Sequence, residues 1–256
     1  MMEQLQSYEA LAPELNALLF SRASVNSVPE REALEAEIAV GALWTEHLGD
    51  GLLLLQRTPD LQRLRFLLPD PAALCQWKPD RRTALELPFR RGDTRFPDLA
   101  AALEAAGWRL LLNRVRLTRK AAPAPVSIGF ESSKSPDPEA LLGLLYACFS
   151  PLTGCLPDRA ELNADLAEGR LLAAEGGLIR WRQKGKTSEI RHLAVSPDCR
   201  GKGLAKALVT AYLNREEGKL CRVWTGADNA PALRVYHGFG YAEDGWESLV
   251  LLYDCS

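Results

Sequence analysis

Hydrophobic positions recur along the chain with helical or strand spacing and divide its first 120 residues into elements. Leu11, Leu15, Leu18 and Leu19 predict an apolar helix, and an acidic helix is expected from Pro29 to about Ala39. Strands over Gly51–Arg57 and Leu61–Leu68, separated by Thr-Pro-Asp, predict a hairpin. The remaining predicted elements are a strand over Thr83–Phe89, a helix over Phe96–Ala106 and a strand over Trp108–Thr118.

The same kinds of element begin again after Ala121–Pro125, whose two prolines and small residues suit an extended connector. The sequence therefore predicts two domains, residues 1–122 and 126–256. The elements expected in the second are a short strand ending near Glu131, helices over Pro138–Phe149 and Asp158–Glu168, strands over Arg170–Glu175, Leu178–Gln183 and Lys219–Thr225, a helix over Ala230–His237 and a closing strand over Tyr241–Tyr253.

One stretch, Ser188–Leu213, combines a strand, a Ser-Pro-Asp turn, a basic loop with two glycines and a helix. The helix is indicated by Leu204, Ala207, Leu208, Ala211 and Tyr212, which share one face at a period of 3.6 residues. The loop before it reads Arg-Gly-Lys-Gly. Glycines permit close backbone approach, and a helix start presents unpaired N–H groups. This combination predicts an anion site for a phosphate-bearing ligand.

Composition narrows the class of protein. With 47% hydrophobic and 25% charged residues among 256, the chain is globular. A net charge of −2 argues against a nucleic-acid-binding protein. The six cysteines form no Cys-x-x-Cys pair, and the three histidines lie far apart, so we expect reduced thiols, no metal site and a cytoplasmic location. The polar start MMEQLQSYEA is unlike a signal peptide, and no apolar run is long enough for a membrane span.

The two halves share an order of elements, which suggests a diverged internal duplication. The clearest match sets Ala106-Gly107-Trp108 beside His237-Gly238-Phe239. Where the second half has its basic glycine loop, the first has Asp70-Pro71-Ala72-Ala73. If the halves are duplicates, only the second keeps the anion site.

Residues 126–253 resemble the GCN5-related N-acetyltransferase (GNAT) family. The resemblance rests on the loop Arg200–Ala205, on the preceding Leu-Ala-Val-Ser-Pro, and on Asn229 followed by a helix and Gly-Phe-Gly-Tyr. It implies a mixed α/β, acyl-CoA N-acyltransferase fold in two tandem GNAT-like domains, the first degenerate and without a CoA site.

The resemblance also implies acetyl-CoA as cosubstrate. In the family the pantetheine arm pairs with a bulged strand, here Leu193–Val195, which diverges from the strand containing Val223–Thr225. The residues expected to bind acetyl-CoA are Leu193, Ala194, Val195, Arg200, Gly201, Lys202, Gly203, Leu204, Ala205, Lys206, Asn229 and Tyr236.

Two residues are candidates for proton transfer by their match to the family. Glu189 occupies the position of a base that acts directly or through water, and a solvated strand charge is the alternative. Tyr236 occupies the position of the acid that protonates the thiolate, and a packed core tyrosine is the alternative. Arg191 is either a surface ion-pair partner or a ligand for a substrate carboxylate. Strand alternation places His192 opposite Glu189, which favours a structural role.

The implied reaction is acetyl transfer to a primary amine by direct attack in a ternary complex. The loop Phe149–Pro157 and the following helix are expected acceptor contacts. Asp158, Glu161 and Asp165 there would suit a cationic amine, or they are simply solvated. A non-catalytic acyl-CoA-binding regulatory module is the alternative function.

Overall fold

The computed structural model describes residues 2–123, 132–133 and 136–255. Within these ranges the chain forms two compact units. Unit 1 comprises Met1–Asn113 and Trp246–Ser256, and unit 2 comprises Arg114–Gly245. The strand predicted to end near Glu131 lies outside the described residues. No helix in the described ranges is long and apolar enough to cross a membrane.

Unit 1 is a mixed sheet with helices on both faces. Its helical elements are α1 (Tyr8–Phe20), α2 (Arg31–Ala39), the 3-10 helix η1 (Pro71–Cys75) and α3 (Arg95–Ala105). Its strands are β1 (Glu3–Gln4), β2 (Ser24–Val25), β3 (Leu43–Leu48), β4 (Gly51–Arg57), β5 (Gln62–Leu68) and β6 (Thr83–Arg90). Strand pairing follows the order β1-β3-β4-β5-β6, with β2 on β5. The predicted hairpin is β4–β5, and it is confirmed.

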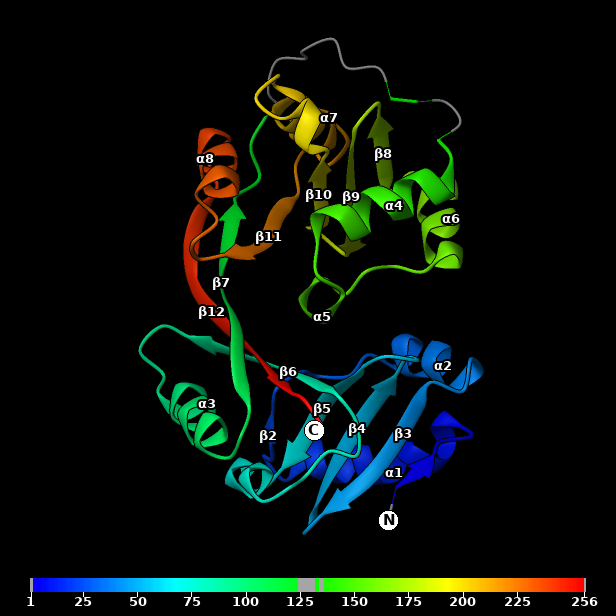
Figure 1. The fold of residues 1–256 in the computed structure, drawn as a ribbon, viewed down its shortest axis with the longest axis vertical. Helices are drawn as coiled ribbons and strands as arrows, with labels where there is room; N and C mark the ends of the chain where they lie inside the picture. Colours follow the sequence, from blue (N-terminus) through cyan, green and yellow to red (C-terminus); the bar gives the residue numbers. More distant parts are fainter. Residues whose placement is uncertain (1, 124–131, 134–135, 256) are drawn as a thin grey trace. The chain divides into compact units, whose positions relative to one another are not determined.

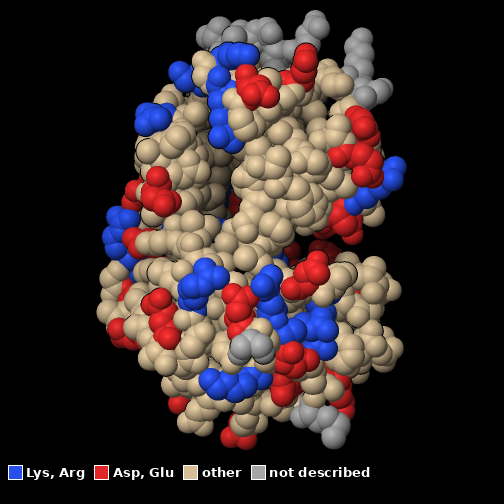
Figure 2. Space-filling view, in the orientation of Figure 1, with Lys and Arg blue, Asp and Glu red and all other residues tan. Residues whose placement is uncertain are grey.

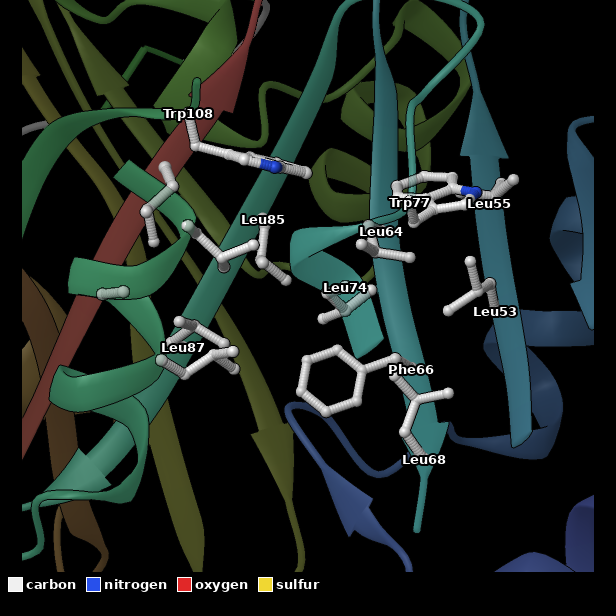
Figure 3. Packing of buried hydrophobic residues seen from close by; sticks show 14 residues of the cluster. Leu53, Leu55, Leu64, Phe66, Leu68, Leu74, Trp77, Leu85, Leu87 and Trp108 are labelled. Carbon is white, nitrogen blue, oxygen red and sulfur yellow. The ribbon is translucent and has the colours of Figure 1, made fainter. Parts of the chain in front are cut away.

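The core of unit 1 has two layers, one on each face of the sheet. Leucines of α1 and α2 pack on Leu52 and Leu54. On the other face, η1 and α3 pack on the alternate residues Leu53 and Leu55. Figure 3 shows this second layer, in which Phe66 lies toward Leu74 of η1. The period of two along β4 thus supplies both layers.

Unit 2 has the same arrangement. Its helical elements are α4 (Pro138–Cys148), α5 (Pro151–Gly154), α6 (Arg159–Ala167), the 3-10 helix η2 (Pro197–Cys199), α7 (Leu204–Arg215) and α8 (Ala230–Gly238). Its strands are β8 (Leu171–Ala174), β9 (Gly177–Lys184), β10 (Thr187–Val195) and β11 (Leu220–Gly226). In both units an antiparallel hairpin precedes a short parallel pairing, β5–β6 in unit 1 and β10–β11 in unit 2.

The last strand of each sequence half pairs in the other unit. Strand β7 (Arg109–Arg119) follows α3, yet it pairs antiparallel with β11. Strand β12 (Ala242–Tyr253) follows α8, yet it pairs antiparallel with β6. Figure 1 shows these as the two strands that run from one unit into the other. The compact units therefore differ from the ranges 1–122 and 126–256 because of this strand exchange.

Candidate active site

The two faces of the unit 2 sheet are covered by different helices. Leu208 and Tyr212 of α7 and Tyr236 of α8 share one buried cluster with Ile190 and Val223. We call this side the α7 face. Leucines of α4 and α6 form another cluster with Ala173, Leu178 and Ala194 on the opposite side, the α4 face.

The basic glycine loop lies at the start of α7. Gly201 and Gly203 have φ of +75° and +85°, a conformation that L side chains rarely adopt, and no atom lies within 4 Å of a Cβ built at either position. Gly203 is also the N-cap of α7 and supplies no side-chain cap. The first amides of this helix therefore remain available to an anion.

Basic side chains lie close to this loop in the sequence, at Arg200, Lys202 and Lys206. Figure 2 shows Lys and Arg side chains gathered at the upper end of unit 2, around α7. Arg200 folds back on the sheet, where its Nε donates to the Val195 carbonyl at 3.1 Å. The loop thus meets both requirements of a pyrophosphate site, exposed amides and positive charge.

Strands β10 and β11 pair only over their first residues. Their parallel register ends at Ile190 and Val223, although β10 continues to Val195 and β11 to Gly226. Along its other edge β10 stays paired with β9 up to Val195. Residues Leu193–Val195 consequently present a strand edge toward β11 without a partner strand among the described residues. An extended amide-bearing arm would find hydrogen-bonding groups there.

The bulge lies earlier in β10 than predicted. The register between β10 and β9 shifts between Ile190 and His192, and not at Leu193–Val195. Arg191 is therefore the extra residue of the bulged strand. Strand β10 begins to diverge from β11 at this point, because a bulge bends a strand and increases its twist.

The bulge also reverses the expected orientation of His192. Glu189 pairs with Arg182 and His192 with Arg180, and these arginines are two residues apart on an unbulged strand. Glu189 and His192 therefore share a face, and the prediction of opposite faces was wrong. His192 packs its ring against Phe149 at 5.2 Å between centroids.

His192 is a buried, neutral histidine. Its Nε2 lies 2.9 Å from the Gly154 carbonyl, which can only accept, so Nε2 carries the proton. Its Nδ1 is buried without a hydrogen-bond partner. Burial lowers the pKa of His192 from 6.5 to about 4. The hydrogen bond of His192 links β10 to the end of α5, which agrees with the structural role expected from the sequence.

Glu189 lies on the α4 face within an ion-pair network. Its Oε1 is 3.0 Å from Nη1 of Arg191 and 3.5 Å from Nη2 of Arg182. Its side chain is 16% exposed. Glu189 is therefore more than a solvated strand charge, because two guanidinium groups hold it beside the point where β10 and β11 diverge.

Tyr236 lies on the α7 face, in the second turn of α8. It is 3% exposed, and its ring packs against Tyr241 at 5.5 Å between centroids. Burial raises the pKa of Tyr236 well above 10. The phenol is therefore protonated at neutral pH, as a proton donor requires. Asn229 is the N-cap of α8. Its Oδ1 accepts a hydrogen bond from the amide of Ala232 at 3.2 Å, so this oxygen stabilises the start of the helix.

The acidic residues of the predicted acceptor region are engaged within the protein. Asp158 and Glu161 form a capping box at the start of α6, with bonds of 2.8 and 3.1 Å. Asp165 is 5% exposed and pairs with Arg170 and Arg180. These carboxylates give no support to a cationic acceptor, and Asp165 is not simply solvated.

In unit 1, the place that corresponds to the divergence of β10 and β11 lies between β5 and β6, and the chain itself fills it. The parallel pairing of β5 and β6 ends at Leu64 and Leu85, after which β2 pairs with β5. Next to β2, the buried side chain of Asn26 donates to the carbonyls of Leu64 and Glu86 and accepts from the amide of Phe66. Between β5 and β6 the chain forms η1 in place of a long helix. Sequence reasoning missed this role of Asn26, since nothing local in its sequence predicts it.

Comparisons with known proteins agree with the geometry. The sequence profile of the acetyltransferase (GNAT) family matches residues 132–241. Residues 132–241, within unit 2, therefore correspond to a GNAT domain. Over 75 residues the chain is 29% identical to an uncharacterized N-acetyltransferase of Methanocaldococcus jannaschii, a match that spans 27% of this chain and about a third (33%) of that relative.

Solved structures show the same fold over nearly the whole chain. A tandem GNAT protein from the clavulanic acid biosynthesis pathway aligns with a TM-score of 0.61 at 14% identity, over 98% of this chain and 97% of that one. A GCN5-related N-acetyltransferase of Sphaerobacter thermophilus aligns at 0.58 and 14% identity, over 98% and 94%. The predicted mixed α/β, acyl-CoA N-acyltransferase fold is confirmed.

Proposed function

We propose that this protein is an acyltransferase that moves the acetyl group of acetyl-CoA to a primary amine. The observation that carries the proposal is the joint presence, in unit 2, of the open glycine loop before α7 and the unpaired edge of β10. The first suits a pyrophosphate and the second suits a pantetheine arm. The match of residues 132–241 to the GNAT family supports the same reaction.

The positions of these features suggest how the two substrates meet. The glycine loop begins a helix of the α7 face, so the donor approaches from that face and its thioester reaches the divergence of β10 and β11. The amine then attacks from the α4 face, where Glu189 lies. As the C–N bond forms and the C–S bond breaks, Glu189 accepts the amine's proton, directly or through water, and Tyr236 supplies one to the thiolate. No acyl-enzyme is needed.

Unit 1 serves in this proposal as a GNAT-like domain without a donor site. Its slot between β5 and β6 is occupied by β2 and Asn26, and no glycine loop precedes a long helix there. We therefore expect one acyl-CoA per chain. Dependence on acyl-CoA and the six scattered cysteines fit the expected cytoplasmic location.

Calorimetry and a thiol-release assay test the proposal together. Calorimetry with acetyl-CoA should give one binding site per chain, and longer acyl-CoA thioesters in the same titration would define the donor. Thiol release in the presence of a broad amine panel should exceed release without an amine. Binding without transfer to any amine would favour a non-catalytic acyl-CoA-binding regulatory module. Absence of binding would remove both functions.

A further inference from the structure

The α4 face carries more arginines than are needed to pair with Glu189, the candidate base. Residues Ile190 and Val223 face α7, so their neighbours Glu189 and Arg222, which pair in register, face α4. In the same way Arg222 pairs with Thr118 of β7, and Trp224 pairs with Arg116. Arg182 lies opposite Glu189 on β9. Three neighbouring strands and β7 thus bring arginines to one region beside the divergence of β10 and β11.

The carboxylates of this region are already engaged. Glu189 pairs with Arg191 and Arg182. Asp244 accepts from Nε of Arg116 at 2.8 Å and from the hydroxyl of Thr118 at 2.7 Å. Arg116 also lies over the ring of Trp224, with 5.6 Å from its Cζ to the centroid. These contacts fix the arrangement around Arg222 but supply no anion to it.

Arg222 has no anionic partner among the described residues. Its Nε is buried and makes no hydrogen bond, although the residue as a whole is only half-buried. A buried guanidinium donor without an acceptor is costly, and arginine binds carboxylates through two parallel hydrogen bonds. The nearest charge of opposite sign in the strand register, Glu189, is held by the other two arginines.

We propose that the acceptor is an amino acid, that is, an amine that also carries a carboxylate, and that Arg222 binds this carboxylate. This inference rests on the proposed function. Glu189 and Arg222 are adjacent in register, which matches the short separation of ammonium and carboxylate in such a zwitterion. Arg222 is then a specificity-determining residue. It places the amine beside Glu189 and rejects amines that leave its guanidinium without a partner.

Matched acceptor pairs test the assignment. Each amino acid of a panel is compared with its own carboxamide, and phosphoethanolamine is compared with ethanolamine. In the wild-type protein kcat/KM should favour the acids over their amides by about 10- to 100-fold, the range expected for a charge-assisted hydrogen-bonded pair. Arg222→Gln should abolish this preference, and Arg222→Lys should restore part of it. Acids and amides used equally well, or transfer only to the phosphate-bearing amine, would overturn the inference.

Controls separate this role from a structural one. Arg215→Gln removes an equivalent charge from the exposed end of α7 and should keep the preference for acids. Arg222→Gln should bind acetyl-CoA normally, and its melting temperature should be unchanged or higher, because it removes an unsatisfied buried donor. A lower melting temperature with an equal loss on acids and amides would mark Arg222 as structural and contradict the proposal.

A binding measurement makes the inference independent of turnover. The Nε–H resonance of Arg222 should shift when an amino acid of the panel is added and stay unchanged with its carboxamide. If acetyl-CoA fails to bind while this shift occurs, the proposed reaction is wrong and the carboxylate site stands. If acetyl-CoA binds and another amine is acetylated but no acid shifts the resonance, the reaction stands and the carboxylate site is refuted.

Discussion

Tyr236 is deeply buried next to a second tyrosine, and burial raises its pKa. A phenol that stays protonated can donate to a departing thiolate but contributes little to binding of the donor. Tyr236→Phe should therefore lower kcat by about 100-fold, the lower end of general acid catalysis. Calorimetry should find the affinity for acetyl-CoA within about 2-fold of wild type.

Tyr146→Phe is the matched control, because Tyr146 is 57% exposed on α4 and should tolerate loss of its hydroxyl. An unchanged kcat in Tyr236→Phe would remove this residue as the acid and leave it as a packing residue of the α7 face.

The lowered pKa of His192 leads to a prediction of how the free energy of unfolding changes with pH. Its pKa in the folded protein is about 4, below the 6.5 of the unfolded chain, because burial disfavours the charged imidazole. Between these values the unfolded state binds more protons, so the free energy of unfolding falls as pH drops from 6.5 to 4. This residue alone accounts for a loss of about 3 kcal/mol.

Urea unfolding at pH 7 and pH 4.5 measures this effect. In His192→Gln the decrease between the two pH values should be smaller than in wild type, even if the variant is less stable at pH 7. An identical decrease in both proteins would show that His192 titrates normally in the folded state.

The loop between β10 and α7 allows a matched test at the scale of one element. Gly203 and Gly218 both have positive φ, +85° and +77°, with open space around the missing Cβ. A glutamate at either position carries the same backbone penalty of about 1 kcal/mol. Only Gly203→Glu also places a carboxylate at the start of α7, where we expect the pyrophosphate.

Calorimetry should show that Gly203→Glu weakens acetyl-CoA binding by at least about 100-fold, since like charges at a phosphate site cost several kcal/mol. Gly218→Glu should bind as wild type does. Equal affinities in the two variants would refute the assignment of this loop to the pyrophosphate.

The position of the bulge in β10 could not be predicted from the sequence, although the strand could. The strand itself was predictable from Ile190, Leu193 and Val195, and its bounds agree with the pattern. The position of the extra residue at Arg191 was not, because alternation assumes an unbroken register with β9. One inserted residue moved His192 to the face of Glu189 and shifted the divergence from β11 toward the start of the strand.

The exchanged strands β7 and β12 make a prediction at the scale of the whole molecule. Val115 and Leu117 of β7 belong to the core of unit 2, and β11 pairs with β7 along six residues. A fragment of residues 126–256 contains the complete family match but lacks β7. We expect it to aggregate or to lack stable tertiary structure, because β11 would expose an unpaired edge and an open core.

A fragment of residues 109–256 restores β7 and serves as the comparison. It should give dispersed amide resonances and bind acetyl-CoA, whereas the shorter fragment should do neither. A folded, acetyl-CoA-binding fragment 126–256 would show that β7 is dispensable for unit 2.

The sequence by itself determined the elements and the place that we propose for the donor, because both depend on local signals. Periodic leucines specify helices and strands, and a basic glycine loop before a helix needs only neighbouring residues to form an anion site. The order of these motifs sufficed for the family resemblance. The candidate acid, Tyr236, was also proposed from this resemblance.

Only the tertiary structure decided which strands pair and which side chains share a face. The exchange of β7 and β12, the filling of the unit 1 slot by Asn26, and the register that sets Glu189 opposite Arg222 all depend on residues distant in the chain. These arrangements depend on strand register and on a single bulge, which leave no local pattern. For that reason the proposed donor end of the site could be named from the sequence, whereas the arginine that we propose for the acceptor could not.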